Sequence, residues 1–284
     1  MLGSIAAISV FGLQFSSDFV GGSILEVSYK NIQNVPTLSV AKDHLEPLSL
    51  GEYSLRSSGE NRLVLRSKFI SEDQKNTIVQ ALTHHGETPE VERFNTVGPT
   101  VGESLKNKSY IAIALVVLCI MLFITFAFRK VSDPVPSWKF GFATVIALAH
   151  DVLIPTGIYV VYGYYVGAEI DLLFVTALLA ILGYSVHDTI VVFDRTRENL
   201  AHNIEHRNRE SFDATVGKSL SQTMTRSINT SVTIFLTLLA LYFVGSDATK
   251  HFSFTLLLGV IIGTYSSICV ASPLLVALEK SKKL

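Results

Sequence analysis

Ionisable side chains inside long apolar stretches are the residues of this sequence that could do chemistry. His150-Asp151 and His187-Asp188 each lie within an apolar run, and Arg226 lies just before another. A charge inside a bilayer is costly, so such residues usually have a function. By the rise of an α-helix, Asp188 and Arg226 lie about 25 Å and about 28 Å from one end of their runs. Because pairing lowers the cost of burying charge, we predict an acid–arginine pair between them that couples to protons.

The same reasoning makes His150, Asp151 and His187 further candidates for proton coupling. His150 lies about 18 Å from the end of its run, near the middle of a membrane. An alternative stays open for all five residues: they could be buried hydrogen-bonding partners that take no part in proton transfer.

Two further patterns indicate a polar interior and close helix packing. Polar residues spaced three and four apart form a stripe on one helical face: Gln222, Arg226, Asn229, Thr233 and Thr237. Lipid cannot form hydrogen bonds with their side chains. We therefore expect the stripe to line a protein or water-filled interior. Small residues recur at four-residue spacing in the last apolar run, a pattern typical of tightly packed membrane helices: Gly259, Gly263 and Ser267.

The elements that must position these residues are membrane spans. The chain has 284 residues, of which 49% are hydrophobic and only 17% charged, which is unlike a soluble domain. A spanning helix needs about 20 mostly apolar residues. The runs that qualify are Tyr110–Phe128, Phe140–Tyr162, Leu172–Phe193, Ile228–Val244 and Phe252–Leu278. Met1–Phe15 is apolar but short, so we expect residues 1–17 to form part of a first span.

Basic residues predict the orientation, because they favour the cytoplasmic side. They gather in three places: Arg129, Lys130 and Lys139; Arg195, Arg197, Arg207, Arg209, Lys218 and Arg226; and Lys280, Lys282 and Lys283. The C-terminus is then cytoplasmic, and residues 109–284 hold spans two to six. The polar connection 195–225 is predicted to be cytoplasmic and amphipathic, with one or two helices over Arg195–Lys218 that lie along the membrane surface.

Residues 18–108 must then lie outside and are predicted to fold as a small α+β domain. Strands are expected at Ile24–Tyr29, Arg62–Phe69 and Glu90–Asn95, with a hairpin turn at Ser57–Asn61. Ser71 and Gln74 form a capping box before a helix, and Val40–Leu48 is a second candidate helix. Two helices among about four strands favour a ferredoxin-like fold.

Other signals argue against enzymatic or nucleic-acid-binding functions. The formal net charge of −1 does not suit a nucleic-acid partner. No P-loop motif occurs, so we expect no ATP hydrolysis by that route. His202 to His206 matches a zinc-peptidase pattern, but its charged surroundings favour a solvated helix face. His84-His85 is interpreted as charge at a helix end. We expect no enzymatic activity, no metal and no cofactor.

The fourth span makes a resemblance recognisable. Gly183 to Asn199 (GYSVHDTIVVFDRTREN) closely resembles the signature of the SecD/SecF family of protein-export membrane proteins, in its SecF form. Four other stretches are similar to the family in the same order: Asp18–Gly22 (DFVGG), Val97–Gly102 (VGPTVG), Ile146–Asp151 (IALAHD) and Ser219–Ser231 (SLSQTMTRSINTS). The resemblance covers nearly the whole chain.

The resemblance implies a fold, a function and partners. It implies a six-helix half-unit, similar in plan to resistance-nodulation-division exporters, that pairs with SecD in the bacterial cytoplasmic (inner) membrane. It implies use of the proton-motive force to promote export of unfolded preproteins, alongside SecYEG, SecA, YajC and YidC. By position, Asp188 and Arg226 match the family's proton-coupling residues. His187 stands where the family commonly has Asn, and Ser16-Ser17 where it has Gly-Ile.

Two alternatives to this function stay open. One is a half-sized proton-coupled exporter of the same superfamily that moves small molecules or lipids. The other is a scaffold subunit that supports SecD without transducing energy.

Overall fold

A computed structural model describes residues 1–129, 135–208 and 210–280 of the chain. Within it the chain forms two compact units, Phe15–Ser109 and a helical unit made of Met1–Gln14 and Tyr110–Leu284. The first unit contains the segment 18–108 that was predicted to be a separate domain. Of the basic residues used to predict orientation, Lys130, Arg209, Lys282 and Lys283 lie outside the described residues.

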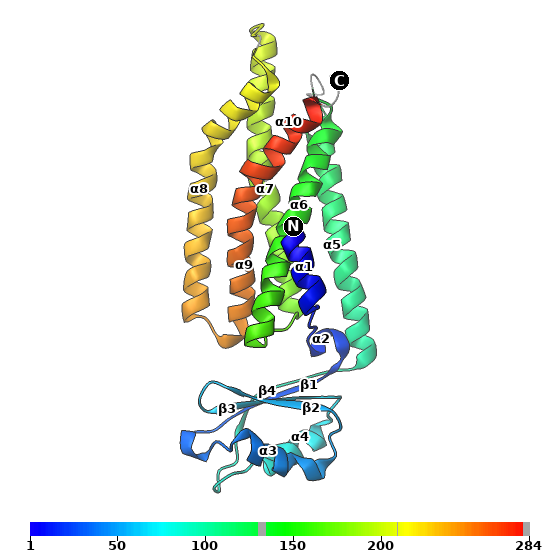
Figure 1. The fold of residues 1–284 in the computed structure, drawn as a ribbon, viewed down its shortest axis with the longest axis vertical. Helices are drawn as coiled ribbons and strands as arrows, with labels where there is room; N and C mark the ends of the chain where they lie inside the picture. The colour runs from blue at the N-terminus through cyan, green and yellow to red at the C-terminus, as the bar shows by residue number, and fades with distance from the viewer. Residues whose placement is uncertain (130–134, 209, 281–284) are drawn as a thin grey trace. The chain divides into compact units, whose positions relative to one another are not determined.

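The unit Phe15–Ser109 is a four-stranded antiparallel sheet with two α-helices against one face (Figure 1). The strand order is β2-β3-β1-β4, and β1 pairs with both β3 and β4. The elements along the chain are α2 (Ser17–Val20), β1 (Gly22–Ser28), η1 (Ile32–Asn34), α3 (Leu38–Leu45), η2 (Glu46–Leu48), β2 (Tyr53–Ser58), β3 (Arg62–Ser67), α4 (Glu72–Ala81) and β4 (Glu90–Val97). The predicted strands, both helices and the β2–β3 hairpin are confirmed.

Alternation along the strands builds the core of this unit. Leu63 and Leu65 of β3 and Leu25 of β1 point to the same face and are buried with Leu45 of α3 and Ile78 of α4. The predicted capping box is confirmed, since Ser71 and Gln74 each accept a hydrogen bond from the other's backbone N–H. Buried apolar side chains from both helices thus attach them to the sheet.

A buried hydroxyl ties the end of β1 to the end of α4. The Tyr29 hydroxyl donates to the Leu82 carbonyl at 2.6 Å, and burial raises the pKa of Tyr29 to about 12. The phenol therefore stays protonated and keeps donating throughout the physiological range.

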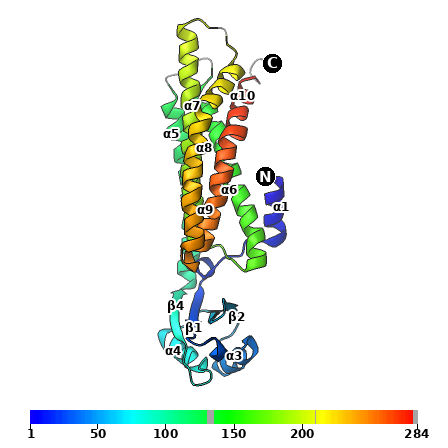
Figure 2. The same ribbon diagram turned by 90° about the vertical axis from the view of Figure 1, so that its left-hand side faces the viewer.

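The helical unit is a bundle of long, roughly antiparallel helices, seen from two sides in Figures 1 and 2. Its elements are α1 (Leu2–Phe11), the greater part of α5 (Pro99–Ala127), α6 (Ser137–Val166), α7 (Leu172–Glu205), α8 (Phe212–Val244), α9 (Asp247–Ser266), a π-helical turn η3 (Ser267–Ala271) and α10 (Ser272–Lys280). Within the described residues, five helices are long and apolar enough to cross a membrane: α5, α6, α7, α8 and the continuous stretch from α9 to α10.

Two predicted boundaries differ from the structure. The first apolar segment is helical only over Leu2–Phe11, because Gly12 takes a positive φ of 69° and turns the chain. The connection predicted over residues 195–225 is not a separate surface segment. Helix α7 continues to Glu205 and α8 begins at Phe212, so only residues 206–211 join them. Hydrogen bonds between polar side chains of α7 and α8 let both helices extend beyond their apolar parts.

Glycines bring α9 against α7. A Cβ added at Gly259 would lie 2.1 Å from Cγ1 of Ile181, and one added at Gly263 would lie 3.2 Å from Cβ of Ser185. The small residues at these positions therefore let the backbones of the two helices approach closely.

A buried ion pair holds α10 to the start of α6. Lys139 Nζ lies 2.9 Å from Glu279 Oε2 and donates to the Leu278 carbonyl at 2.7 Å. Both side chains are buried, so each charge depends on the other.

We predict that Gly259→Ala destabilises the protein by about 1–3 kcal/mol, because Ile181 has no room to yield without repacking. The measurement is the thermal unfolding of the purified protein in detergent. Gly183→Ala is the matched control on α7, since its added Cβ meets no atom within 4 Å. Equal stability of the two variants would contradict the close α7–α9 contact.

Candidate functional site

Asp188 lies buried where α7, α8 and η3 meet. Ser227 of α8 donates to Asp188 Oδ1 at 2.5 Å, and Ser267 of η3 donates to Oδ2 at 2.7 Å. Asp188 makes no ion pair within the described residues. Two hydroxyl donors therefore stabilise this carboxylate, in place of the predicted guanidinium.

Asp151 is a second buried acid, held in the same way by α7 and α9. Its Oδ2 accepts hydrogen bonds from Ser185 of α7 and from Ser266 of α9, the latter at 2.6 Å. His150 Nδ1 lies 2.9 Å from Asp151 Oδ1, and the His150 ring stacks on Tyr265 with 6.3 Å between ring centroids. Asp151 and His150 are thus brought together, and both are buried.

Most of the predicted polar stripe of α8 faces away from this bundle, whereas Gln222 contacts α7. Gln222, Arg226, Asn229, Thr233 and Thr237 are all exposed in the chain. Within the described residues, no ion pair or side-chain hydrogen bond joins Arg226 to Asp188. The predicted pair is therefore not formed here, because Arg226 lies on the outer side of α8 while its neighbour Ser227 faces inward.

A stripe of small hydroxyls, which the sequence reasoning missed, forms the inner face of α8. Its members recur every four residues and are buried: Thr215, Ser219, Thr223, Ser227 and Ser231. The hydroxyl groups of Ser219, Thr223 and Ser231 each donate a hydrogen bond to the backbone carbonyl four residues earlier. The four-residue period was the signal that could have found them. Short side chains of this kind fit a close helix contact that an arginine would hold apart.

A hydroxyl triad on α7, α8 and α9 lies one turn from Asp188. The Tyr184 hydroxyl lies 2.6 Å from Ser231 Oγ and 3.1 Å from Thr264 Oγ1, and the last two lie 2.6 Å apart. The interior around Asp188 is therefore polar over at least two helical turns.

His187 points in a different direction from its neighbour Asp188 and is exposed. Consecutive residues of an α-helix point about 100° apart, which explains why the two neighbours do not share an environment. The structure does not bring His187 to the buried acids.

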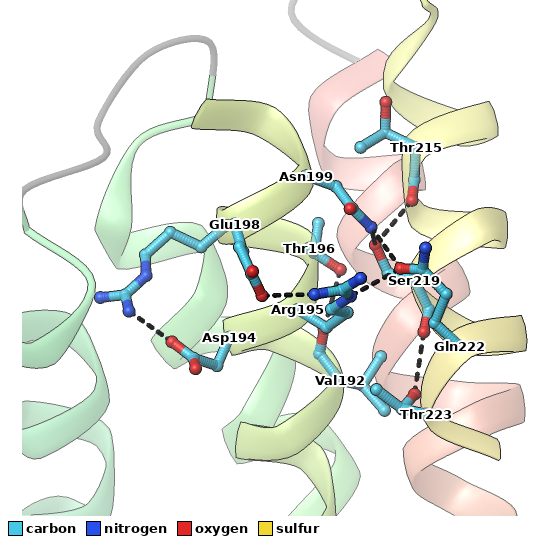
Figure 3. Close-up of polar contacts among 11 residues, drawn as sticks. Val192, Asp194, Arg195, Thr196, Glu198, Asn199, Thr215, Ser219, Gln222 and Thr223 are labelled. Carbon is cyan, nitrogen blue, oxygen red and sulfur yellow. Dashed lines mark hydrogen bonds and ion pairs between the residues drawn. The ribbon is translucent and has the colours of Figure 1, made fainter. Parts of the chain in front are cut away.

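A second polar contact joins α7 to α8 near the 206–211 loop (Figure 3). Asn199 Nδ2 donates to Ser219 Oγ at 2.8 Å and to Gln222 Oε1 at 2.9 Å. Gln222 Oε1 also accepts from Arg195 Nε at 2.6 Å, and Arg195 pairs with Glu198 at 2.6 Å. Gln222, predicted to line an interior, instead holds two helices together.

Asn203 continues this contact into the loop. It donates to Glu210 Oε2 at 2.9 Å, and this hydrogen bond holds the pKa of Glu210 below its ordinary value. The loop is thereby fixed to α7 at neutral pH.

Comparison with known proteins identifies the family to which the chain is similar. The family described as "Protein export membrane protein SecD/SecF, C-terminal" matches residues 77–281. The chain belongs to the SecD/SecF family. Membership, together with five apolar helices, makes it a multi-pass membrane protein.

Relatives within the SecD/SecF family resemble the chain over most of its length. The protein translocase subunit SecF of Thermobaculum terrenum is 43% identical over 279 residues, which cover 95% of this chain and 86% of the relative. The SecF subunit of Anaerolinea thermophila is 35% identical, over 98% of this chain and 88% of the relative.

Solved structures of SecDF proteins share the fold. The SecDF structure from Thermus thermophilus, a translocon-associated membrane protein, matches 98% of this chain with a TM-score of 0.80 at 30% identity. A SecDF structure in a super-membrane-facing form matches with a TM-score of 0.67 at 29% identity. The chain spans 36% and 37% of those two SecDF chains.

We predict that Asn199→Ala lowers stability by about 1–3 kcal/mol, because it removes two hydrogen bonds from a buried α7–α8 contact. Thermal unfolding of the purified protein measures the effect. Glu205→Ala, an exposed change on the same helix, serves as the control and should leave the unfolding midpoint within error. A midpoint for Asn199→Ala equal to that of the control would show that the contact does not hold these helices.

Proposed function

We propose that this chain is the SecF-type subunit of a membrane complex that uses the proton-motive force to promote export of preproteins. Its relatives over nearly the full length are named protein translocase subunit SecF, which supports the proposal. Burial of Asp188 among hydroxyl groups in a membrane-spanning bundle is the observation that carries the proton-coupling part. An ionisable group in that position is expensive and usually functional.

The proposed architecture is a six-helix half-unit with a ferredoxin-like outer domain. The element order β1-α3-β2-β3-α4-β4 and the strand order β2-β3-β1-β4 support the ferredoxin-like assignment. Helix α1, which packs along α6, would supply part of the first span (Figure 2).

The outer face of α8 supports a SecD-type partner. Asn229 and Thr233 lie in the apolar run of α8 and are exposed in the chain, and Arg226 lies just before them. Lipid cannot satisfy these groups, so another protein or a water-filled space must cover them. The solved SecDF chains are nearly three times as long as the part that this chain matches, which leaves room for such a partner.

Two neighbouring residues of α8 suggest how a proton could act across that face. Ser227 binds Asp188 inside the bundle, while Arg226 points to the outer face. A protonated Asp188 is a poorer acceptor for Ser227 and Ser267, so α8 would shift relative to α7 and move Arg226 against the partner. One proton crossing 100 mV supplies about 2.3 kcal/mol, enough to change a two-state ratio by tens of fold.

The proposed location is the bacterial cytoplasmic membrane, with residues 18–108 outside and the C-terminus in the cytoplasm. Basic residues flanking the spans support this orientation, among them Arg195, Arg197 and Lys218. The proposed substrate is an unfolded preprotein, and SecYEG, SecA, YajC and YidC are proposed neighbours on the resemblance alone.

We predict the orientation to be measurable with an impermeant thiol reagent on intact cells. In a chain carrying Cys119→Ala and Cys269→Ala, an engineered Ser57→Cys should react and an engineered Asn208→Cys should be protected. Both positions are exposed, so access alone separates them. Labelling of the Asn208→Cys protein and protection of the Ser57→Cys protein would overturn the orientation.

We predict that Asp188→Asn abolishes the proton-dependent part of secretion, because an amide cannot ionise. The loss should reach tens of fold, in line with the energy of one proton. Secretion of a reporter with and without an uncoupler measures it, and co-purification with the SecD-type partner should be unchanged. Arg226→Lys should also fail, since the proposed contact of Arg226 with the partner uses the planar fork of a guanidinium, which an ammonium lacks.

Two controls make this test specific. Asp194→Asn neutralises an exposed acid of the same helix, which pairs with Arg197 at 2.5 Å, and should secrete normally. His187→Asn alters an exposed neighbour and should keep most activity. Uncoupler-sensitive secretion by Asp188→Asn at the normal rate would remove this acid from the proton route and favour a scaffold subunit.

A further inference from the structure

Two buried acids, not one, share the polar centre of this bundle. Asp151 comes from α6 and Asp188 from α7, and both are at most 6% exposed. The function proposed above needs only Asp188. Asp151, which the sequence also makes a candidate for proton coupling, takes no part in that proposal.

The hydrogen-bond partners of the two acids are neighbours in the chain. Ser266 donates to Asp151 and Ser267, the next residue, donates to Asp188. Ser185 of α7 also donates a hydrogen bond to Asp151. It lies three residues before Asp188, on the helical turn toward which the Asp188 side chain points. Helix α7 and the junction of α9 with η3 thus each connect the two carboxyl groups.

A change of helix type occurs at the bridging serines. Helix α9 ends at Ser266 and the π-helical turn η3 begins at Ser267. The Ser272 hydroxyl donates to the Ser267 carbonyl at 2.9 Å and so supports the wider turn. Single π-helical turns within α-helices are frequent at functional sites.

Few nearby ionisable groups could neutralise a negative charge on Asp151 or Asp188. The ionisable side chains next to them within the described residues are His150 and Tyr265 beside Asp151, and Tyr184 one turn from Asp188. His187 and Arg226 are exposed and point elsewhere. Because consecutive serines bind the two carboxyl groups, a negative charge on one of them disfavours a negative charge on the other in this dry interior.

We propose that Asp151 and Asp188 form one proton-binding unit, linked through Ser266 and Ser267 at the π-helical turn, which holds a single proton between the two carboxyl groups over the working pH range. This inference deepens the proposed function and rests on it, because it names a second proton-binding residue for the same site. Loading a second proton, or releasing the first, would then change the hydrogen bonds that support η3.

The test is an infrared titration of the full-length chain, purified with its SecD-type partner and reconstituted in liposomes. The carbonyl stretch of protonated carboxyl groups is followed with pH for the unchanged protein, Asp151→Asn, Asp188→Asn and the double variant, which gives the background. We expect the pair to titrate in two steps. In each single variant the remaining carboxyl group should lose its proton at a pH about one unit or more below the upper step of the unchanged protein. One unit is a tenfold change in proton affinity.

Serine variants test the link itself. Ser267→Ala and Ser266→Ala should each change the separation of the two steps. Ser253→Ala is the matched control, because this buried serine of the same helix donates only to the Thr249 carbonyl. Its titration should equal that of the unchanged protein.

The outcome is independent of secretion. If the curves of the two single variants add up to that of the unchanged protein, the acids titrate separately and the proposal is wrong, even if Asp188→Asn fails in secretion. If the two steps are coupled while Asp188→Asn secretes normally, the unit binds a proton as proposed but the proposed function fails.

Discussion

The centre of the helical unit depends on placing two buried carboxyl groups, Asp151 and Asp188, among serine hydroxyl groups. A buried carboxylate without a partner would be strongly destabilising, and an arginine partner would require space between the helices. Serine meets both constraints, since it donates a hydrogen bond and adds little volume. The tight contact of α9 with α7 at Gly259 and Gly263 is compatible with this solution and would not be with a guanidinium between them.

Helix α8 then carries two different surfaces one residue apart. Its hydroxyl stripe, from Thr215 to Ser231, belongs to the interior of this chain. Its larger polar groups, Arg226 and Asn229, belong to whatever covers the chain from outside. A small rotation of one rigid helix would change both surfaces together. Such an element can pass a local change in protonation to a neighbouring subunit without a long chain of intermediate contacts.

Much of the fold could be predicted from the sequence, and the reasons are local. The capping box at Ser71, the alternation of Leu63 and Leu65 and the turn residues before Asn61 act within a few residues, so their structures followed directly. The apolar runs gave the spanning helices for the same reason. The extended ends of α7 and α8 were missed, because polar residues alone do not distinguish a surface segment from two helices that hydrogen-bond to each other.

The candidate site was harder to predict, because it depends on helix rotation. Asp188 and Asp151 stood out by chemical type, whatever their neighbours. Their partners did not: Ser227, Ser266 and Ser267 are unremarkable in a sequence, and only packing shows that they face the acids. Arg226 was expected to face Asp188, but it lies on the outer face of α8, because two polar stripes run along that helix. A period of four identifies each stripe but not which one faces inward.

The buried pair of Lys139 and Glu279 gives the last helical turn a role that its position would not suggest. Glu279, at the end of α10, neutralises the Lys139 ammonium group at the start of α6. A truncation just before Glu279 would therefore leave a bare cation in an apolar setting instead of merely shortening a tail. Fusion partners and affinity tags are best attached beyond Glu279, so that the buried pair of Lys139 and Glu279 stays intact.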